Sequence, residues 1–214
     1  MHETLKETGE KRIQHENIIE IPGLERHYNA AAWWGPDEKI ILLARYVPQA
    51  SPEGEIDKGP IVAVSVDKNN SPIPTPPEEV KIDSNQVLSR KEVWSPYGKE
   101  EFLEDPRAIV LPDKRVLVGL TSVQRAPNGD YIPHPSILYL PSTDEIPEII
   151  QPHRVITEFG PGKNLVPVDS KTFLFRQEGP ENNHKLLVIK WDEKENSVRE
   201  GGVLEFPTDL DWAS

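Results

Sequence analysis

Proline is the sequence feature that most constrains the fold of this chain. The 214 residues contain 22 prolines and 13 glycines. A proline inside a helix removes a backbone hydrogen bond and clashes with the preceding turn, and the prolines here fall between short apolar runs. We therefore expect helices to be scarce and the chain to fold from short strands joined by turns.

Short β-rich runs recur along the chain, with turn signals between them. The expected strands cover residues 18–21, 29–34, 39–47, 61–66, 93–94, 108–111, 115–123, 137–140, 154–159, 165–168, 172–176, 185–191 and 203–206. No segment beyond the N-terminal tail has a helical period. The pattern is typical of an all-β sandwich, barrel or propeller. We expect a polar tail over residues 1–16 and one domain over residues 17–214, because no later change in composition marks a boundary.

Composition excludes several classes of function. A net charge of −12 and a pI near 5.0 argue against a nucleic-acid groove, which needs a basic surface. The absence of cysteine excludes disulfides and thiolate metal sites, and His27, His153 and His184 lack the spacing of metal ligands. No apolar run has the length of a membrane span, and the N-terminus lacks the apolar core of a signal peptide. We expect a cytoplasmic protein with no metal, nucleic-acid or membrane partner.

The tetrapeptide Glu104-Asp105-Pro106-Arg107, just ahead of the expected strand 108–111, is the main candidate for chemistry. Proline fixes its own φ and biases Asp105 toward extended backbone. A stiffly mounted acid beside a permanently charged arginine can protonate a leaving group or help to hold an anion. Such turns also form purely structural ion pairs, so the tetrapeptide alone does not decide between a catalytic role and a structural one. His134, between two prolines, is interpreted as a loop residue.

Related elements recur at other strand ends. Asn29 precedes a run of alanines, Arg45 ends an apolar strand, Lys163-Asn164 precedes another strand and Arg176 ends a fourth. With the tetrapeptide and the segment 207–212, these elements resemble glycoside hydrolase family 130 in order and approximate spacing. Members of that family are five-bladed β-propeller enzymes that act on β-mannosides. The resemblance covers the chain from about residue 28 onward.

The resemblance implies an enzyme that cleaves β-mannosidic bonds with inversion, with Asp105 as the proton donor acting through a hydroxyl of the bound mannoside. The nucleophile is inorganic phosphate in a phosphorylase and water in a hydrolase, and both remain open. The expected substrate is a mannoside or oligosaccharide, with phosphate as co-substrate and no other cofactor. The resemblance implies sugar contacts from Asn29, Glu104 and Arg107, and phosphate contacts from Arg45, Lys163, Asn164 and Arg176.

The chain also departs from the family. It is shorter than its members, so we expect an incomplete propeller of about three to four blades, truncated at the C-terminus. The later histidine and tyrosine of the phosphorylases have no counterpart, nor does the later acid of the hydrolases. An open propeller has an exposed sheet edge, so a homo-oligomer or a second chain is expected to complete it. The alternative function is a catalytically incomplete propeller that binds carbohydrate or protein; an arabinanase-like propeller of family 43 needs three acids that we cannot assign.

Several candidates have a structural interpretation as well. Arg45 and Arg176 could be ordinary cations at strand ends, and Glu104 could make structural hydrogen bonds only. Trp33 and Trp34 are adjacent in an expected strand, so their side chains should point to opposite faces and one of them should be buried. This pattern favours packing over a sugar-binding platform.

Overall fold

The computed structural model describes residues 19–20, 27–35, 39–46, 61–67, 80–81, 87–93, 95–97, 102–140, 150–179 and 185–204. In these segments every regular element is a β-strand, so the predicted all-β class is confirmed. No helix in these segments is long and apolar enough to cross a membrane. The expected tail over residues 1–16 and the segment 207–212 lie outside the described residues.

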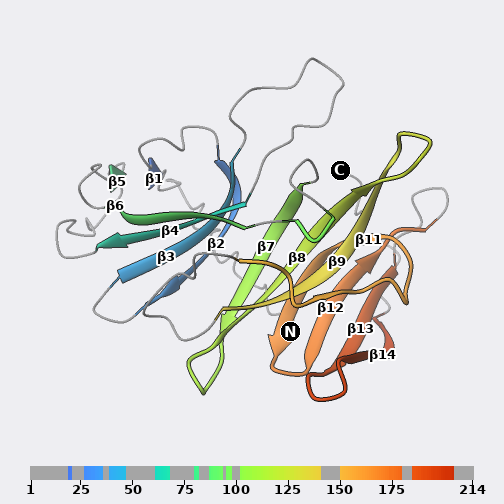
Figure 1. Ribbon diagram of the computed structural model, residues 1–214. Coiled ribbons are helices and arrows are strands. Elements are labelled where there is room, and N and C mark those ends of the chain that lie inside the picture. The colour runs from blue at the N-terminus through green and yellow to red at the C-terminus, as the bar shows by residue number, and fades with distance from the viewer. Residues whose placement is uncertain are drawn as a thin grey trace, which may run out of the picture.

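Three four-stranded antiparallel sheets account for most of the described strands (Figure 1). The first sheet contains β2 (His27–Trp34), β3 (Lys39–Tyr46), β4 (Ile61–Asp67) and β6 (Val87–Val93). The middle sheet contains β7 (Leu103–Val110), β8 (Val116–Arg125), β9 (Tyr131–Leu140) and β10 (Arg154–Val155). The last sheet contains β11 (Gly162–Asp169), β12 (Thr172–Gln177), β13 (Lys185–Asp192) and β14 (Ser197–Leu204). A parallel pair, β1 (Ile19–Glu20) and β5 (Val80–Lys81), stands apart from them. Within each large sheet the strands follow chain order, so each sheet is a meander.

The middle sheet is buried on both faces, and β8 shows this most clearly. Val118 and Leu120 belong to the core shared with the first sheet, whereas Leu117 belongs to the core shared with the last sheet. All residues of β8 from Val116 to Val123 are buried. A strand covered on both faces reads as a continuous apolar run rather than an alternating one, which explains why the sequence predicted this strand well.

Gly119 allows the last sheet to approach the middle sheet closely. A Cβ atom at this position would lie 2.0 Å from the carbonyl oxygen of Leu165 on β11. Only a residue without a side chain fits against that backbone. The distance between β8 and β11 is therefore set by this glycine.

The first strand of each sheet carries the same backbone irregularity. Asn29, Asp105 and Asn164 have φ angles of 48°, 51° and 56°. Each of them sits in a β-bulge, where the register with the second strand shifts. Asparagine and aspartate tolerate this left-handed conformation better than other non-glycine residues. The three sheets are thus repeats of one plan, with β2 and β11 both packed against β7.

Three expectations about proline are wrong. Asp105, expected to be extended because it precedes Pro106, is left-handed with a φ of 51°. The tetrapeptide at residues 104–107 lies inside β7, at its bulge, and not ahead of the strand. Pro133 and Pro135 lie inside β9, so His134 is a strand residue and not a loop residue. The carbonyl of Pro135 accepts a hydrogen bond from the backbone N–H of Ile156, on the side of β9 away from β8. Its ring nitrogen points to that side too, so no ladder bond to β8 is lost.

Three strands begin well before their predicted runs. β6, β9 and β14 begin six residues earlier than the predicted runs at 93, 137 and 203, and β10 is shorter than the predicted run 154–159. The outermost strands carry polar residues, which hide their β character from a search for apolar runs. In β2, Trp33 is buried and Trp34 is exposed, as expected from the alternation of side chains.

Candidate functional site

The N-terminal ends of β2, β7 and β11 lie together at one end of the stacked sheets, and several predicted site residues are in contact there. The side-chain amide of Asn29 donates a hydrogen bond from Nδ2 to Oδ1 of Asp105 at 2.5 Å, which joins the first and middle sheets. Lys163 on β11 donates from Nζ to Oε2 of Glu104 at 3.0 Å, which joins the middle and last sheets. The shared bulges therefore bring together residues that lie more than 130 positions apart in the chain.

Glu104 is the buried centre of this end. Its side chain is 4% exposed, and each of its oxygens faces a different cation. Arg45 Nη1 from the first sheet lies 3.0 Å from Oε1, and Lys163 Nζ from the last sheet lies 3.0 Å from Oε2. The Arg45 guanidinium also lies over the ring of Phe102, 5.8 Å from its centroid. Because a buried carboxylate is costly unless it is paired, Glu104 fixes the positions of the two cations as much as they fix it.

Asp105 is next to Glu104 but has a different environment. It is partly exposed, and its backbone is left-handed at the bulge. Asn29 occupies Oδ1, while Oδ2 accepts no hydrogen bond from any described residue. Non-glycine residues in this conformation are held at a cost by their surroundings and are concentrated at functional sites. Asp105 is thus held in place through one carboxylate oxygen only.

The remaining predicted residues lie on the same bulged strands or on a strand paired with one of them. Arg107 Nη1 donates to the carbonyl of Pro106 at 2.9 Å, so its side chain folds back on the bulge. Arg176 is the cross-strand partner of Lys163, and its Nε is buried without a hydrogen-bond partner in the described part of the chain. Asn164 occupies the third bulge. Like charges in a cross-strand pair repel each other, so an anion near Arg176 would relieve the pair.

Among the predicted site residues, cations outnumber carboxylates. The cations are Arg45, Arg107, Lys163 and Arg176, and the carboxylates are Glu104 and Asp105. The excess of two positive charges within this set favours an anion as its ligand.

Sequence reasoning missed a polar cluster beside the start of β7. Ser122 on β8 accepts a hydrogen bond from the Ser136 hydroxyl at 2.7 Å, and both side chains are buried. His134 is the cross-strand partner of Ser122, and its ring centroid lies 6.1 Å from that of Tyr97. Burial lowers the pKa of His134 and raises that of Tyr97. The two adjacent hydroxyl residues at 121–122, in an otherwise apolar run, were the signal that could have revealed it.

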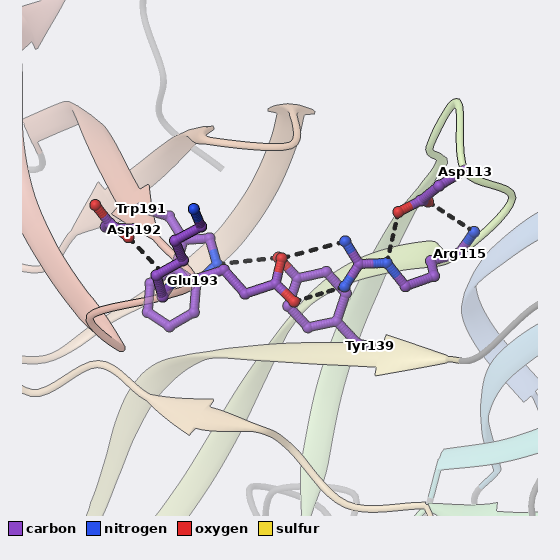
Figure 2. A network of polar contacts seen from close by, with 7 residues as sticks. Asp113, Arg115, Tyr139, Trp191, Asp192 and Glu193 are labelled. Carbon is purple, nitrogen blue, oxygen red and sulfur yellow. Dashed lines mark hydrogen bonds and ion pairs between the residues drawn. The ribbon is translucent and has the colours of Figure 1, made fainter.

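A cleft of about 1110 Å³ lies at the opposite end of the middle and last sheets. Its wall contains the network in Figure 2, in which the Arg115 guanidinium lies between Asp113 and Glu193. Hydrogen bonds from Arg115 hold the pKa of both carboxyls below their ordinary values. The same guanidinium lies 4.9 Å from the ring centroid of Tyr139, whose hydroxyl accepts a hydrogen bond from Trp191 Nε1 at 3.0 Å. None of the predicted site residues lines this cleft. We therefore assign the network a structural role, as a polar contact that joins the two sheets.

No group of three or more histidine, aspartate or glutamate side chains in the described segments is arranged to hold a metal ion. Comparison with the models of known protein families, with curated proteins and with solved structures gave no significant match.

Proposed function

We propose that this protein cleaves β-mannosidic bonds with inversion of configuration, using inorganic phosphate as the nucleophile and Asp105 as the proton donor. The observation that carries the proposal is the environment of Asp105. It is partly exposed, it lies on a left-handed bulge, and Asn29 of another sheet holds one of its oxygens. Its neighbour Glu104 brings Arg45 and Lys163 to the same end of the sheets. An oriented acid beside an anion-binding cluster is what phosphorolysis of a glycoside requires.

The arrangement of the sheets supports a propeller as the setting of this site. The three large sheets are consecutive meanders of the same plan, and their first strands lie next to one another. In a propeller the first strand of each blade lies nearest the central channel, where ligands bind. We therefore interpret the sheets as three blades of a five-bladed propeller, with Asn29, Asp105 and Asn164 at equivalent positions near its axis.

Phosphorolysis is favoured over hydrolysis by the state of Glu104. An inverting hydrolase needs a second carboxylate, roughly 6.5–9.5 Å from the acid, to activate water. Glu104 is buried, and a cation occupies each of its oxygens, so neither oxygen is placed to activate a water molecule. Phosphate brings its own nucleophilic oxygen, which attacks the anomeric carbon as the bond to the leaving oxygen breaks. The leaving oxygen takes a proton from a hydroxyl of the sugar, and that hydroxyl takes the proton of Asp105. Arg176 and the neighbouring cations hold the phosphate.

The test is an assay of the purified chain with β-1,4-mannobiose, with and without inorganic phosphate. We expect phosphate-dependent release of mannose 1-phosphate. Asp105→Asn should lower kcat by about 10²- to 10⁴-fold, the usual contribution of a general acid. Asp169→Asn is the matched control, because Asp169 lies at the opposite end of β11, and it should leave kcat unchanged. An unchanged rate in Asp105→Asn would show that the assignment is wrong, and release of free mannose without phosphate would indicate a hydrolase.

A second candidate is a propeller that binds carbohydrate without cleaving it. The observation in its favour is that Arg45 and Lys163, both predicted to hold phosphate, are already paired with Glu104. Under this alternative neither product forms, but calorimetry detects mannobiose binding that Asn29→Ala weakens. If the chain neither releases a product nor binds mannobiose, both proposed functions are wrong.

A further inference from the structure

The turn between β8 and β9 contains the only asparagine in the chain that is followed by glycine, Asn128-Gly129. Asn128 is exposed at the tip of this hairpin. In such a pair the backbone nitrogen of the glycine can attack Cγ of the asparagine side chain, because no Cβ on the glycine shields that nitrogen. The Asn128 amide is therefore an electrophile next to the least hindered nucleophile that the main chain offers.

The reaction is a deamidation, and it changes the covalent structure of the main chain. The bond between Gly129 N and Asn128 Cγ forms, the bond between Cγ and Nδ2 breaks, and Nδ2 leaves as ammonia with the proton of the Gly129 N–H. Water then opens the cyclic succinimide at either of its carbonyls, giving aspartate or isoaspartate. In isoaspartate the main chain runs through the side-chain carbon atoms, so the turn becomes longer by one atom.

The backbone of the turn keeps the reacting groups apart. Gly129 N–H donates to the carbonyl of Ala126 at 2.9 Å, with Pro127 at the second position of the turn. Asn128 does not have a positive φ, whereas the φ of Gly129 is 95°, so the turn is of type I and is followed by a left-handed glycine. At the third position of a type I turn ψ is about 0°, which directs the next nitrogen away from the side chain. Ring closure therefore requires the hydrogen bond to Ala126 to break and the Asn128 backbone to rotate.

Asp130 holds the Asn128 side chain at both ends of its amide. The Asp130 N–H donates to Oδ1 of Asn128 at 3.2 Å, and Nδ2 of Asn128 donates to Oδ2 of Asp130 at 2.6 Å. A hydrogen bond to an ionised group is stronger than one between neutral groups. Because Asp130 lies beyond Gly129 in the chain, rotation of the Asn128 backbone moves Asp130 away and breaks both of these bonds.

A second exposed turn in the same chain provides a comparison. Asn196, between β13 and β14, is exposed and has a φ of 46°, but the residue after it is Ser197, whose side chain hinders attack by its nitrogen. Asp192 in this turn accepts hydrogen bonds from the backbone N–H groups of Lys194 and Glu195. The two turns therefore share an aspartate that bonds the backbone, and only the β8–β9 turn joins it to an amide that can cyclise.

We propose that Asn128 is a site of spontaneous modification, which converts through a succinimide to aspartate and isoaspartate, and that Asp130 sets the rate by keeping the turn closed. The inference goes beyond the proposed sugar chemistry and does not depend on it. Conversion removes the Nδ2 donor and places a second carboxylate beside that of Asp130, so the modified turn cannot close in the same way. The turn lies at the candidate-site end of the sheets, because Tyr131, the first residue of β9, packs edge-on against Phe102, over which Arg45 lies.

Storage of the purified chain at neutral pH, in buffer and in urea, tests the proposal. Peptide mass spectrometry locates each asparagine that has become a carboxylate, and an isoaspartyl methyltransferase detects isoaspartate. In buffer Asp130→Ala should raise the rate at Asn128 about tenfold, because a hydrogen bond to a charged group is lost. In urea, where the turn is open, the variant and the parent chain should react at equal rates, both faster than the parent chain in buffer. Asn196 should stay unmodified in every sample.

Asp192→Ala is the matched control, because it removes an aspartate that bonds the backbone of the other turn, and it should leave the rate at Asn128 unchanged. Hydrogen exchange gives a second measurement that needs no covalent change. The Gly129 amide should exchange about tenfold faster in Asp130→Ala than in the parent chain. No conversion at Asn128 in urea, equal rates of the two chains in buffer, the same acceleration in urea as in buffer, or an unchanged exchange rate at Gly129 would overturn the proposal.

Discussion

Replacing Glu104 with glutamine should destabilise the protein more than any other single change of charge among the described residues. The substitution keeps the shape of the side chain and removes its negative charge. Both oxygens face cations at 3.0 Å, and the side chain is 4% exposed. One of the two cations would then face an amide N–H₂ group, and both would lose their counter-charge.

The magnitude follows from the burial of the three groups. Removing one partner of a buried ion pair costs about 3–5 kcal/mol, because the remaining charge is left without compensation. Arg45 is 13% exposed and feels most of this cost, whereas Lys163 is 31% exposed and is partly screened by water. We expect a loss of about 4 kcal/mol in the free energy of unfolding, which is a large part of the roughly 5–15 kcal/mol of a typical protein.

Urea unfolding at pH 7, followed by tryptophan fluorescence, measures this loss. With a slope of about 2 kcal/mol per molar, the midpoint should fall by about 2 M. Glu193→Gln is the matched control, since Glu193 also holds a guanidinium but is 44% exposed, and it should cost about 1 kcal/mol or less. If the two variants lose the same stability, Glu104 does not hold the sheets together as argued. The double variant with Arg45→Gln should lose less than the sum of the single variants.

Three further predictions concern stability. Gly119→Ala should lower the free energy of unfolding by about 3 kcal/mol, because the added Cβ would lie 2.0 Å from the Leu165 carbonyl oxygen. A melting temperature within about 2 °C of that of the unmodified protein would contradict this close approach. Asn164→Ala should cost about 1 kcal/mol and Asn164→Gly much less, because the φ of 56° suits glycine; equal melting temperatures for the two variants would argue against the bulge. The hydrogen bond from Arg115 lowers the pKa of Glu193 below its ordinary 4.5, so its stabilisation is complete above pH 4.5 and is lost as the pH falls through the folded-state pKa. Thermal unfolding between pH 6 and 3 should therefore show a smaller decline in Glu193→Gln, and identical declines would exclude this contribution.

Side-chain pattern was enough to predict the class of fold but not the limits of every strand. The apolar run at 115–123 was found because β8 is covered on both faces, so that its residues 116–120 are apolar without alternation. β14 was placed six residues too late, because an outermost strand has water beside it and can carry Ser197, Arg199 and Glu200. The error over Pro133 and Pro135 has a related cause, since only the pairing partners reveal that their nitrogens point away from the ladder.

The sequence by itself determined that the chain is all-β, because many short β-rich runs separated by turns have few other ways to bury their side chains. It also marked Asn29, Arg45, Glu104, Asp105 and Lys163 as candidates, since polar residues at the ends of apolar strands are visible without coordinates. Only the tertiary structure decided which of these residues meet. A bulge turns one side chain toward another sheet, and packing then selects the partner over distances in the chain that no local pattern encodes. Glu104 consequently became a buried counter-ion for cations of two sheets, while its neighbour Asp105 remained partly exposed and bonded to Asn29.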